Sequence, residues 1–234
     1  MTMLQQLETF FQNGFYIHLL QAFLYSTTKN IYISSIIAIK MYSTNYFYWY
    51  GNYFSYLPNR KYNWVKQFIR FTDTGHLASV LPLIYSSTLP VSHNVHFIIM
   101  SGYWIGKLAF NLKDADKIQT NNIIEWHTDL CTYIHHSVPY LLIHYLFKKE
   151  SELRSIDCDY EYSYQTLQHT YIWLYSWFLF IYIPWRMYTN DTVYSILDSK
   201  QTPKKFIYGF VFFIHLLTFL SNYVGYAGCK LIVN

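Results

Sequence analysis

Long apolar runs separated by short polar stretches dominate this chain of 234 residues. A helix needs about 20 mostly apolar residues to cross the hydrocarbon core of a bilayer. The runs are too long for strands and do not alternate between polar and apolar positions, so the pattern favours helices. The six runs that predict spanning helices cover roughly residues 31–49, 65–86, 93–112, 123–147, 168–188 and 205–227.

The remaining stretches complete a prediction of one integral-membrane helical domain over residues 1–234. Residues 4–25 predict an amphipathic helix lying on the membrane, within an N-terminal region of residues 1–30. The most acidic stretch, residues 150–165, predicts a solvated loop. Because the other connections are short, neighbouring helices should pack antiparallel. We therefore expect an all-α, multi-spanning transmembrane bundle of about six helices.

Composition supports a membrane protein. Hydrophobic residues make up 53% of the chain and charged residues only 13%, whereas soluble domains carry about 25% charged residues. The 26 Tyr and 7 Trp suit the aromatic belts of membrane interfaces. Basic residues lie in short clusters between apolar runs, which is typical of loops beside a bilayer and excludes a continuous nucleic-acid surface.

Charge and cysteine placement give two further expectations. The excess of Lys and Arg favours the loops after the first, third and fifth runs as cytoplasmic. The three cysteines, Cys131, Cys158 and Cys229, are far apart and odd in number. Because no C-x-x-C motif is present, neither a zinc ribbon nor a redox motif is supported, and we expect three unpaired thiols. The run HNVH and the pair His135–His136 fall short of the eight or so histidines that membrane di-iron enzymes need, so we expect neither a metal nor a cofactor.

Ionisable residues inside the predicted spans are the candidate functional residues. An ionisable group in a spanning helix costs a few kcal/mol, so it is retained only where something compensates. The second run carries Arg70, Asp73 and His76, and its stretch FTDTGHLASVLPLIY otherwise reads as a membrane segment. The third run opens with His93 and His96. The fourth contains Asp129, Thr132, His135 and His136, of which Asp129, Thr132 and His136 fall on one helical stripe.

These stripes predict a polar pocket between the second, third and fourth helices. One interpretation is a buried hydrogen-bond network that fixes helix packing. The other is nucleophilic hydrolysis, with Thr72 or Thr74 as nucleophile, His136 or His135 as base, and Asp73 or Asp129 as the orienting carboxylate. Both interpretations remain open on the residues alone.

The run TDTGHLAS (72–79), the run HNVHFII (93–99) and GYWIGK (102–107) with Asp114 and Asp116 carry a resemblance that continues through IHHSVPYLLI. Residues 65–147 resemble the core membrane protein shared by baculoviruses, nudiviruses and related large insect DNA viruses, the Ac-eighty-one type. The resemblance implies a role in nucleocapsid envelopment and virion assembly. It further implies viral envelope or capsid proteins as partners, and host intracellular or nuclear membranes and the virion envelope as locations.

A second resemblance concerns FIRFTD (68–73) and HHSVPY (135–140). These stretches are similar to the androgen-induced-gene family of multi-spanning lipid hydrolases, which cleave fatty-acid esters with an intramembrane Thr and a His. It implies a fatty-acyl lipid as substrate. The family's threonine falls on Arg70 in this register, and its histidine matches only after a shift of one residue. A viral membrane protein acting in envelopment is therefore the leading hypothesis, and an intramembrane ester hydrolase is the alternative.

Overall fold

The computed structural model describes residues 2–50, 64–109, 122–190, 193–200 and 202–233, and these residues form helices and helical turns without any strand. The expected all-α class is confirmed. The helices are α1 (Met3–Asn13), α2 (Phe15–Thr28), α3 (Ile31–Tyr50), α4 (Phe71–Ala78), α5 (Leu89–Ala109), α6 (Asn122–Leu153), α7 (Cys158–Glu161), α8 (Tyr164–Trp177), α9 (Ile183–Thr189) and α10 (Lys204–Val233). Short turns of 3-10 helix cover η3 (Trp64–Phe68), η4 (Leu81–Leu83), η5 (Ser86–Thr88) and η7 (Ser195–Leu197), and a π-helical stretch, η6 (Phe178–Tyr182), joins α8 to α9.

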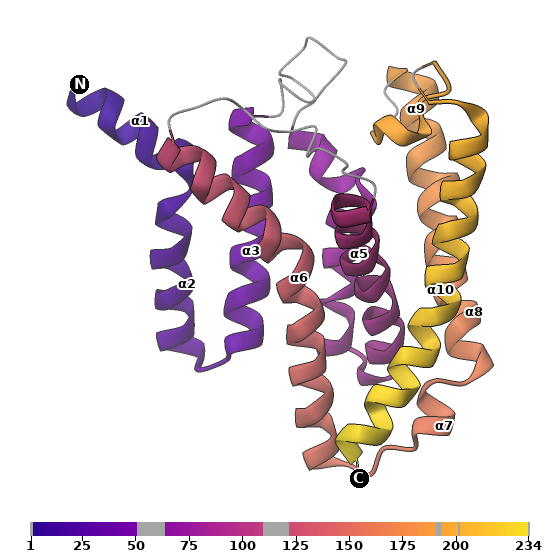
Figure 1. Cartoon of the computed structure of the whole chain (residues 1–234). Coiled ribbons are helices and arrows are strands. Elements are labelled where there is room, and N and C mark those ends of the chain that lie inside the picture. The colour runs from indigo at the N-terminus through magenta and orange to yellow at the C-terminus, as the bar shows by residue number, and fades with distance from the viewer. Residues whose placement is uncertain (1, 51–63, 110–121, 191–192, 201, 234) are drawn as a thin grey trace.

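The helices run up and down beside one another in an elongated bundle (Figure 1). In that view α1 lies at the upper end, and α7 and the C-terminal end of α10 lie at the lower end. Within the described ranges, two apolar cores hold the bundle together. One surrounds Tyr32, Ile143 and Phe147, and the other gathers residues of α4, α5, α8 and α10 around Val95 and Trp177.

The second apolar run, residues 65–86, is not one spanning helix. It is divided into η3, the eight-residue α4, η4 and η5. Arg70 adopts an extended backbone conformation before α4, and Pro82 lies in the turn after it. Because proline removes a backbone donor and clashes with the preceding turn, Pro82 favours an end of the helix there. The apolar composition of residues 65–86 predicted one continuous helix, and this prediction is wrong.

The N-terminal region also differs from the single helix expected over residues 4–25. Gly14 adopts φ +70°, a left-handed conformation that ends α1 and begins α2. Glycine populates this region without steric cost, so the chain can turn there. The second part, α2, packs beside α3 as a member of the bundle.

The expectation of three unpaired thiols is wrong, because Cys158 and Cys229 form a disulfide. Their spacing of 71 residues hid the pair in the sequence, since the fold alone brings α7 onto the end of α10. The acidic stretch is also more than a solvated loop: Ile156, Cys158 and Tyr162 are buried in the core. Cys131 is free and buried.

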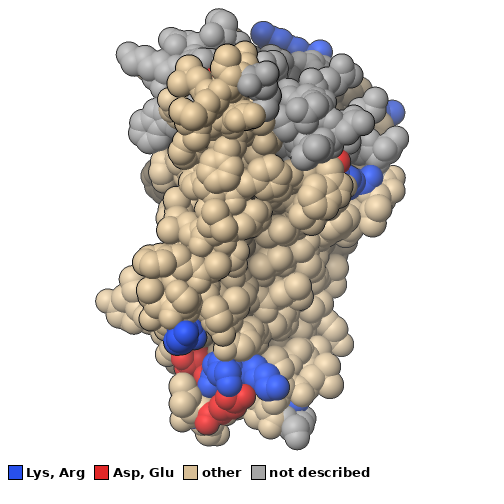
Figure 2. All heavy atoms as spheres, turned by 90° about the vertical axis from the view of Figure 1, so that its left-hand side faces the viewer, with Lys and Arg blue, Asp and Glu red and all other residues tan. Residues whose placement is uncertain are grey.

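Among the described residues, α10 is the one helix that is both long and apolar enough to cross a membrane by itself. The surface is nevertheless rich in exposed apolar side chains, including Phe23, Ile37, Leu141, Phe180 and Phe212. On the face shown in Figure 2, Lys, Arg, Asp and Glu lie toward the two ends and leave an uncharged band between them.

Candidate functional site

The interruption of the second run creates the candidate site. A chain that leaves helical geometry exposes backbone carbonyls that need other donors. Side chains from neighbouring elements supply them: Lys40 Nζ donates to the Gln67 carbonyl at 3.1 Å, Trp177 Nε1 to Ile69 at 2.7 Å, and the Tyr32 hydroxyl to Ser79 at 2.5 Å. The short helix α4 is therefore held in place from α3 and α8, and its side chains project into the bundle.

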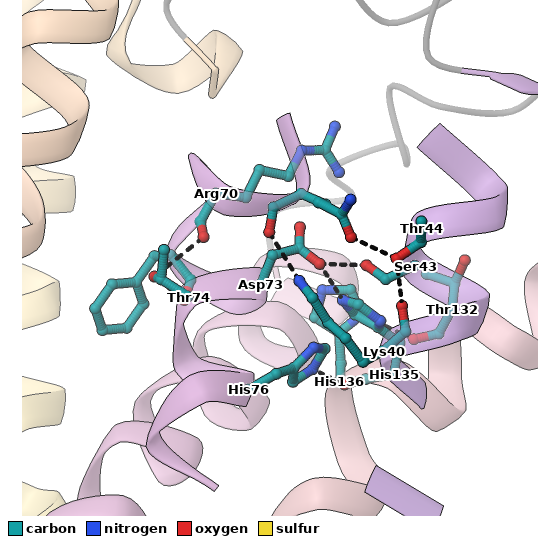
Figure 3. Close-up of polar contacts among 12 residues, drawn as sticks. Lys40, Ser43, Thr44, Arg70, Asp73, Thr74, His76, Thr132, His135 and His136 are labelled. Atoms are coloured by element: carbon teal, nitrogen blue, oxygen red, sulfur yellow. Dashed lines mark hydrogen bonds and ion pairs between the residues drawn. The ribbon is translucent and has the colours of Figure 1, made fainter. Parts of the chain in front are cut away.

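Asp73, in the first turn of α4, is the centre of the site, and its side chain is 1% exposed. The Ser43 hydroxyl of α3 donates to Asp73 Oδ1. His135 of α6 places its Nε2 atom 3.4 Å from the same oxygen. Figure 3 shows these side chains converging from α3, α4 and α6. We call Lys40, Ser43, Asp73, His76 and His135 the Asp73 cluster.

His76 lies one turn after Asp73 and is also buried. Its ring centre is 4.3 Å from that of His135 and 6.1 Å from that of His96. Its Nε2 atom is 3.4 Å from the His135 carbonyl, whereas its Nδ1 atom is buried without a hydrogen-bond partner among the described residues. An imidazole nitrogen left without a partner in a bundle interior is costly, which marks this part of the cluster as incomplete.

A cavity of about 210 Å³ adjoins the cluster at His135. Aliphatic side chains alternate in its walls with polar, aromatic and thiol groups. The lining residues come from α2, α3 and α6: Ile17, His18, Gln21, Ser35, Ala38, Ile39, Tyr42, Cys131, Ile134, His135 and Val138. His135 therefore connects a buried carboxylate to an apolar cavity.

The structure separates His135 from His136, which were equivalent candidates in the sequence. The His136 ring stacks on Tyr103 of α5 at 3.8 Å, and its Nδ1 atom donates to the Thr132 carbonyl at 2.8 Å. The His135 ring instead faces Asp73, because neighbouring residues of a helix point in different directions. Asp129 is half-buried on α6.

Neither threonine candidate is shown in contact with His135. The Thr74 hydroxyl lies 3.2 Å from the Arg70 carbonyl and 3.0 Å from the Phe71 carbonyl, within its own helix. Thr72 directly precedes Asp73 on α4, so its side chain points in a different direction from that of Asp73. The Arg70 guanidinium lies 5.0 Å from the centre of the Phe47 ring.

The third-run histidines divide between two places. His96 Nε2 lies 2.6 Å from the Ser79 hydroxyl at the end of α4, beside His76. His93 belongs to a separate buried group of His93, Asn94, Tyr140, Thr170 and Asn222, which we call the Asn94 network. The expected convergence of the second, third and fourth runs is present at His76, His96 and His135.

Sequence reasoning missed the contribution of α3. Lys40 and Ser43 belong to the site, and Lys40 stands within the apolar run IIAIKMYST. A lysine inside a predicted span is a signal of the same kind as Asp73. Asp114 and Asp116, which carry part of the viral resemblance, lie outside the described residues.

Chemically, the cluster combines one carboxylate with two imidazoles. Ligand atoms of Asp73, His76 and His135 all lie within 4.8 Å of one another, so they could hold a divalent cation as a two-histidine, one-carboxylate set. The same groups suit acid–base catalysis, because a carboxylate that orients an imidazole raises its ability to take a proton.

Comparison of the chain with family models, with curated proteins and with solved structures finds no match.

Proposed function

We propose that this chain is a multi-spanning integral membrane protein. The apolar side chains exposed along the helices and the uncharged band of Figure 2 support this proposal. At 1.5 Å per residue, α3 with 20 residues and α5 with 21 residues each reach about 30 Å, the thickness of a hydrocarbon core. The broken second run lies inside the bundle, where irregular backbone is tolerated at membrane depth.

The disulfide supports an orientation for this membrane protein. Disulfides form and persist in oxidising compartments, so the end of the bundle that carries Cys158 and Cys229 lies in a lumen or outside the cell. The C-terminal ends of α3, α5 and α9 lie at the opposite end of the bundle (Figure 1). The distribution of Lys and Arg favours the loops after these helices as cytoplasmic, which makes the two arguments agree.

Within this membrane protein, we propose hydrolysis of a fatty-acyl ester as the activity of the Asp73 cluster. The observation that carries the proposal is His135, whose ring faces Asp73 on one side and the apolar cavity on the other. Asp73 would accept a hydrogen bond from Nε2 and fix the tautomer, which leaves Nδ1 to take a proton. The aliphatic part of the cavity wall, formed by Ile17, Ala38, Ile39, Ile134 and Val138, suits an acyl chain.

The reaction that this arrangement supports is general-base hydrolysis. His135 takes a proton from a water molecule, the oxygen attacks the ester carbonyl, and the proton then passes to the departing alkoxide. Products are a fatty acid and an alcohol. The nucleophile of this proposal is water, because the Thr74 hydroxyl donates within its own helix and the Thr72 side chain points in a different direction from its neighbour Asp73.

The test uses purified full-length protein in detergent or nanodiscs and a fluorogenic fatty-acyl ester. We expect wild-type turnover and a loss of about 100-fold or more in His135→Ala. The matched control is His136→Phe, which retains the stacking on Tyr103 and should retain turnover. Folding is followed by size-exclusion elution and by formation of the Cys158–Cys229 disulfide.

Two outcomes would contradict the hydrolase. One is wild-type turnover no higher than that of protein-free nanodiscs, and the other is equal turnover in His135→Ala. Labelling of Ser43, Thr72 or Thr74 by a fluorophosphonate would instead replace water with that hydroxyl as nucleophile.

The biological role that we propose is envelopment of a viral nucleocapsid. The resemblance over residues 65–147 supports it, and the residues that carry the resemblance include Asp73, His76, His93 and His96, all buried in the bundle. In an infected cell, the protein should fractionate with intracellular or nuclear membranes and with enveloped virions. Deletion of its gene should leave nucleocapsids without envelopes, and normal envelopment in the deletion would reject the role.

A further inference from the structure

A second cluster of metal-binding side chains lies where α2 meets the first turns of α6. His18 Nε2 is 3.0 Å from His127 Nε2, and Cys131 Sγ is 3.4 Å from the same His127 atom. All three ligand atoms lie within 4.8 Å of one another. His127 and Cys131 are spaced i, i+4 and therefore share one face of α6.

The surroundings fix the His127 ring. Its centre lies 4.3 Å from that of Phe15 and 6.2 Å from that of Tyr42. Its position beside the turn where Gly14 redirects the chain into α2 is thus set by ring contacts. Orientation of a histidine ring by its surroundings is typical of metal ligands.

These distances agree with a tetrahedral zinc site. Zinc binds histidine nitrogen at about 2.0–2.1 Å and thiolate at about 2.3 Å, so two nitrogens of one site stand about 3.3 Å apart, and nitrogen and sulfur about 3.6 Å. The observed separations of 3.0 Å and 3.4 Å need only small adjustments. We propose that His18, His127 and Cys131 bind Zn²⁺, with the Cys131 thiol releasing its proton to solvent as the sulfur–zinc bond forms.

Three protein ligands leave one coordination position open, as in catalytic rather than structural zinc sites. His18 and Cys131 line the same cavity as His135, and Cys131 and His135 are again spaced i, i+4 on α6. The fourth ligand is therefore a water molecule or a substrate oxygen from the cavity. This site does not depend on the hydrolase proposal, because it uses none of the residues of the Asp73 cluster.

The competing interpretation is a hydrogen-bonded group without a metal, in which His127 accepts from His18 and Cys131. A measurement of zinc binding distinguishes this interpretation from the zinc site. Purified full-length protein is loaded with Zn²⁺, dialysed, and analysed for metal per chain, and Co²⁺ replaces Zn²⁺ for absorption spectra. Because Cys158 and Cys229 are paired, Cys131 is the only free thiol of the three cysteines, and its alkylation by N-ethylmaleimide reports its exposure directly.

We expect one Zn²⁺ per chain, tetrahedral d–d bands and a thiolate-to-cobalt charge-transfer band with Co²⁺, and slower alkylation of Cys131 when Zn²⁺ is present. Affinity should fall by about tenfold or more in His18→Ala and in Cys131→Ser. His169→Ala, an exposed histidine of α8, is the matched control and should bind as wild type does. Asp73→Asn should also retain the metal.

His18 is exposed, so His18→Ala tests the site without threatening the fold. Absence of retained zinc in the wild-type protein, retention of zinc in both ligand variants, or cobalt spectra without the thiolate band would each overturn the proposal.

Discussion

The Asn94 network and the Asp73 cluster are both buried polar groups inside one helical bundle, yet they differ in completeness. In the Asn94 network, Asn94 Nδ2 donates to Thr170 at 3.1 Å and to Asn222 at 3.0 Å, and Asn222 Nδ2 donates to the Tyr162 carbonyl at 2.8 Å. His93 Nδ1 lies 3.2 Å from Asn94 Oδ1, and its Nε2 atom lies 3.2 Å from the Tyr140 hydroxyl.

One assignment of protons satisfies this entire network. If His93 Nδ1 carries the proton, it donates to Asn94 and its Nε2 atom accepts from Tyr140. Thr170 donates to the Thr166 carbonyl at 2.9 Å and so is free to accept from Asn94. A neutral, fully paired network of this kind fixes the packing of α5, α6, α8 and α10 and offers nothing to a ligand.

The Asp73 cluster is charged, leaves His76 Nδ1 without a partner among the described residues, and adjoins a cavity. The comparison teaches that burial and histidine content alone do not distinguish packing from chemistry. A buried polar atom without a hydrogen-bond partner next to a cavity does distinguish them. A ligand can supply the missing hydrogen bond there, whereas a fully paired network gains no hydrogen bond from a ligand.

The largest expected effect concerns the end of the bundle next to the Asn94 network. Cys158 and Cys229 close a long loop there, and removal of such a cross-link costs up to about 4 kcal/mol of unfolding free energy in the chain-entropy account. We therefore expect a reductant, or the double variant Cys158→Ser with Cys229→Ser, to lower stability by an amount of this order.

Ester turnover per folded molecule should survive that change, because the disulfide joins α7 to α10 at the lower end of the bundle (Figure 1), and neither helix contributes a residue to the Asp73 cluster. Denaturant unfolding with and without reductant measures the effect. The double variant is its own control, since reductant should not destabilise it further. A wild-type protein equally stable in reductant would contradict the prediction.

The second prediction concerns the Asp73 cluster, where we expect a loss of turnover without a loss of stability. Asp73→Asn keeps an oxygen that accepts from Ser43 but removes the charge that supports protonated His135. Turnover should fall by about 100-fold or more, while folded yield changes little. A variant whose turnover stays within about twofold of wild type would remove Asp73 from the mechanism.

The third prediction concerns Asn94 itself. Asn94→Leu strands His93, Thr170 and Asn222 in the interior, which should lower stability by about 2–3 kcal/mol and leave turnover per folded molecule unchanged. Gln168→Leu, an exposed polar position on α8, is the matched control and should be nearly neutral. Equal stabilities in the two variants would mean that the network does not fix the packing.

The sequence predicted the helical class and most of the helices, because those runs are long and apolar. It also predicted that Asp73 and His76 face histidines of α5 and α6, because an ionisable group in an apolar run needs a partner. It could not predict the division of residues 65–86, since the donors that satisfy the broken backbone come from Lys40, Trp177 and Tyr32, distant in the chain.

The choice between His135 and His136 was beyond sequence reasoning for a related reason. Helical spacing places Asp129, Thr132 and His136 on one stripe, but which stripe faces Asp73 depends on the rotation of α6 against α4. That rotation is set by packing, including the stacking of His136 on Tyr103. The Cys158–Cys229 pair was hidden in the same way, because only the folded chain brings α7 to α10.

The smallest expected effect concerns the packing around the Asn94 network, and it tests how far Tyr162 can move. A Cβ atom at Gly225 of α10 would lie 2.1 Å from Tyr162 Cε1 and 2.7 Å from two further atoms of that ring. Tyr162 cannot yield easily, because its carbonyl accepts from Asn222 and its ring is buried beside His93. Gly225→Ala should therefore lower stability by about 1–3 kcal/mol through overpacking.

Gly209 lies on the same helix with open space around its Cα, so Gly209→Ala is the matched control. That variant should be neutral or more stable by up to about 1 kcal/mol, because alanine favours helices over glycine. Denaturant unfolding of the two single variants measures the difference. If both behave alike, Tyr162 moves aside without cost, and the Asn94 network is held less firmly than its hydrogen bonds indicate. If only Gly225→Ala is destabilised while its turnover per folded molecule persists, the packing role of this region is separated from the chemistry at Asp73.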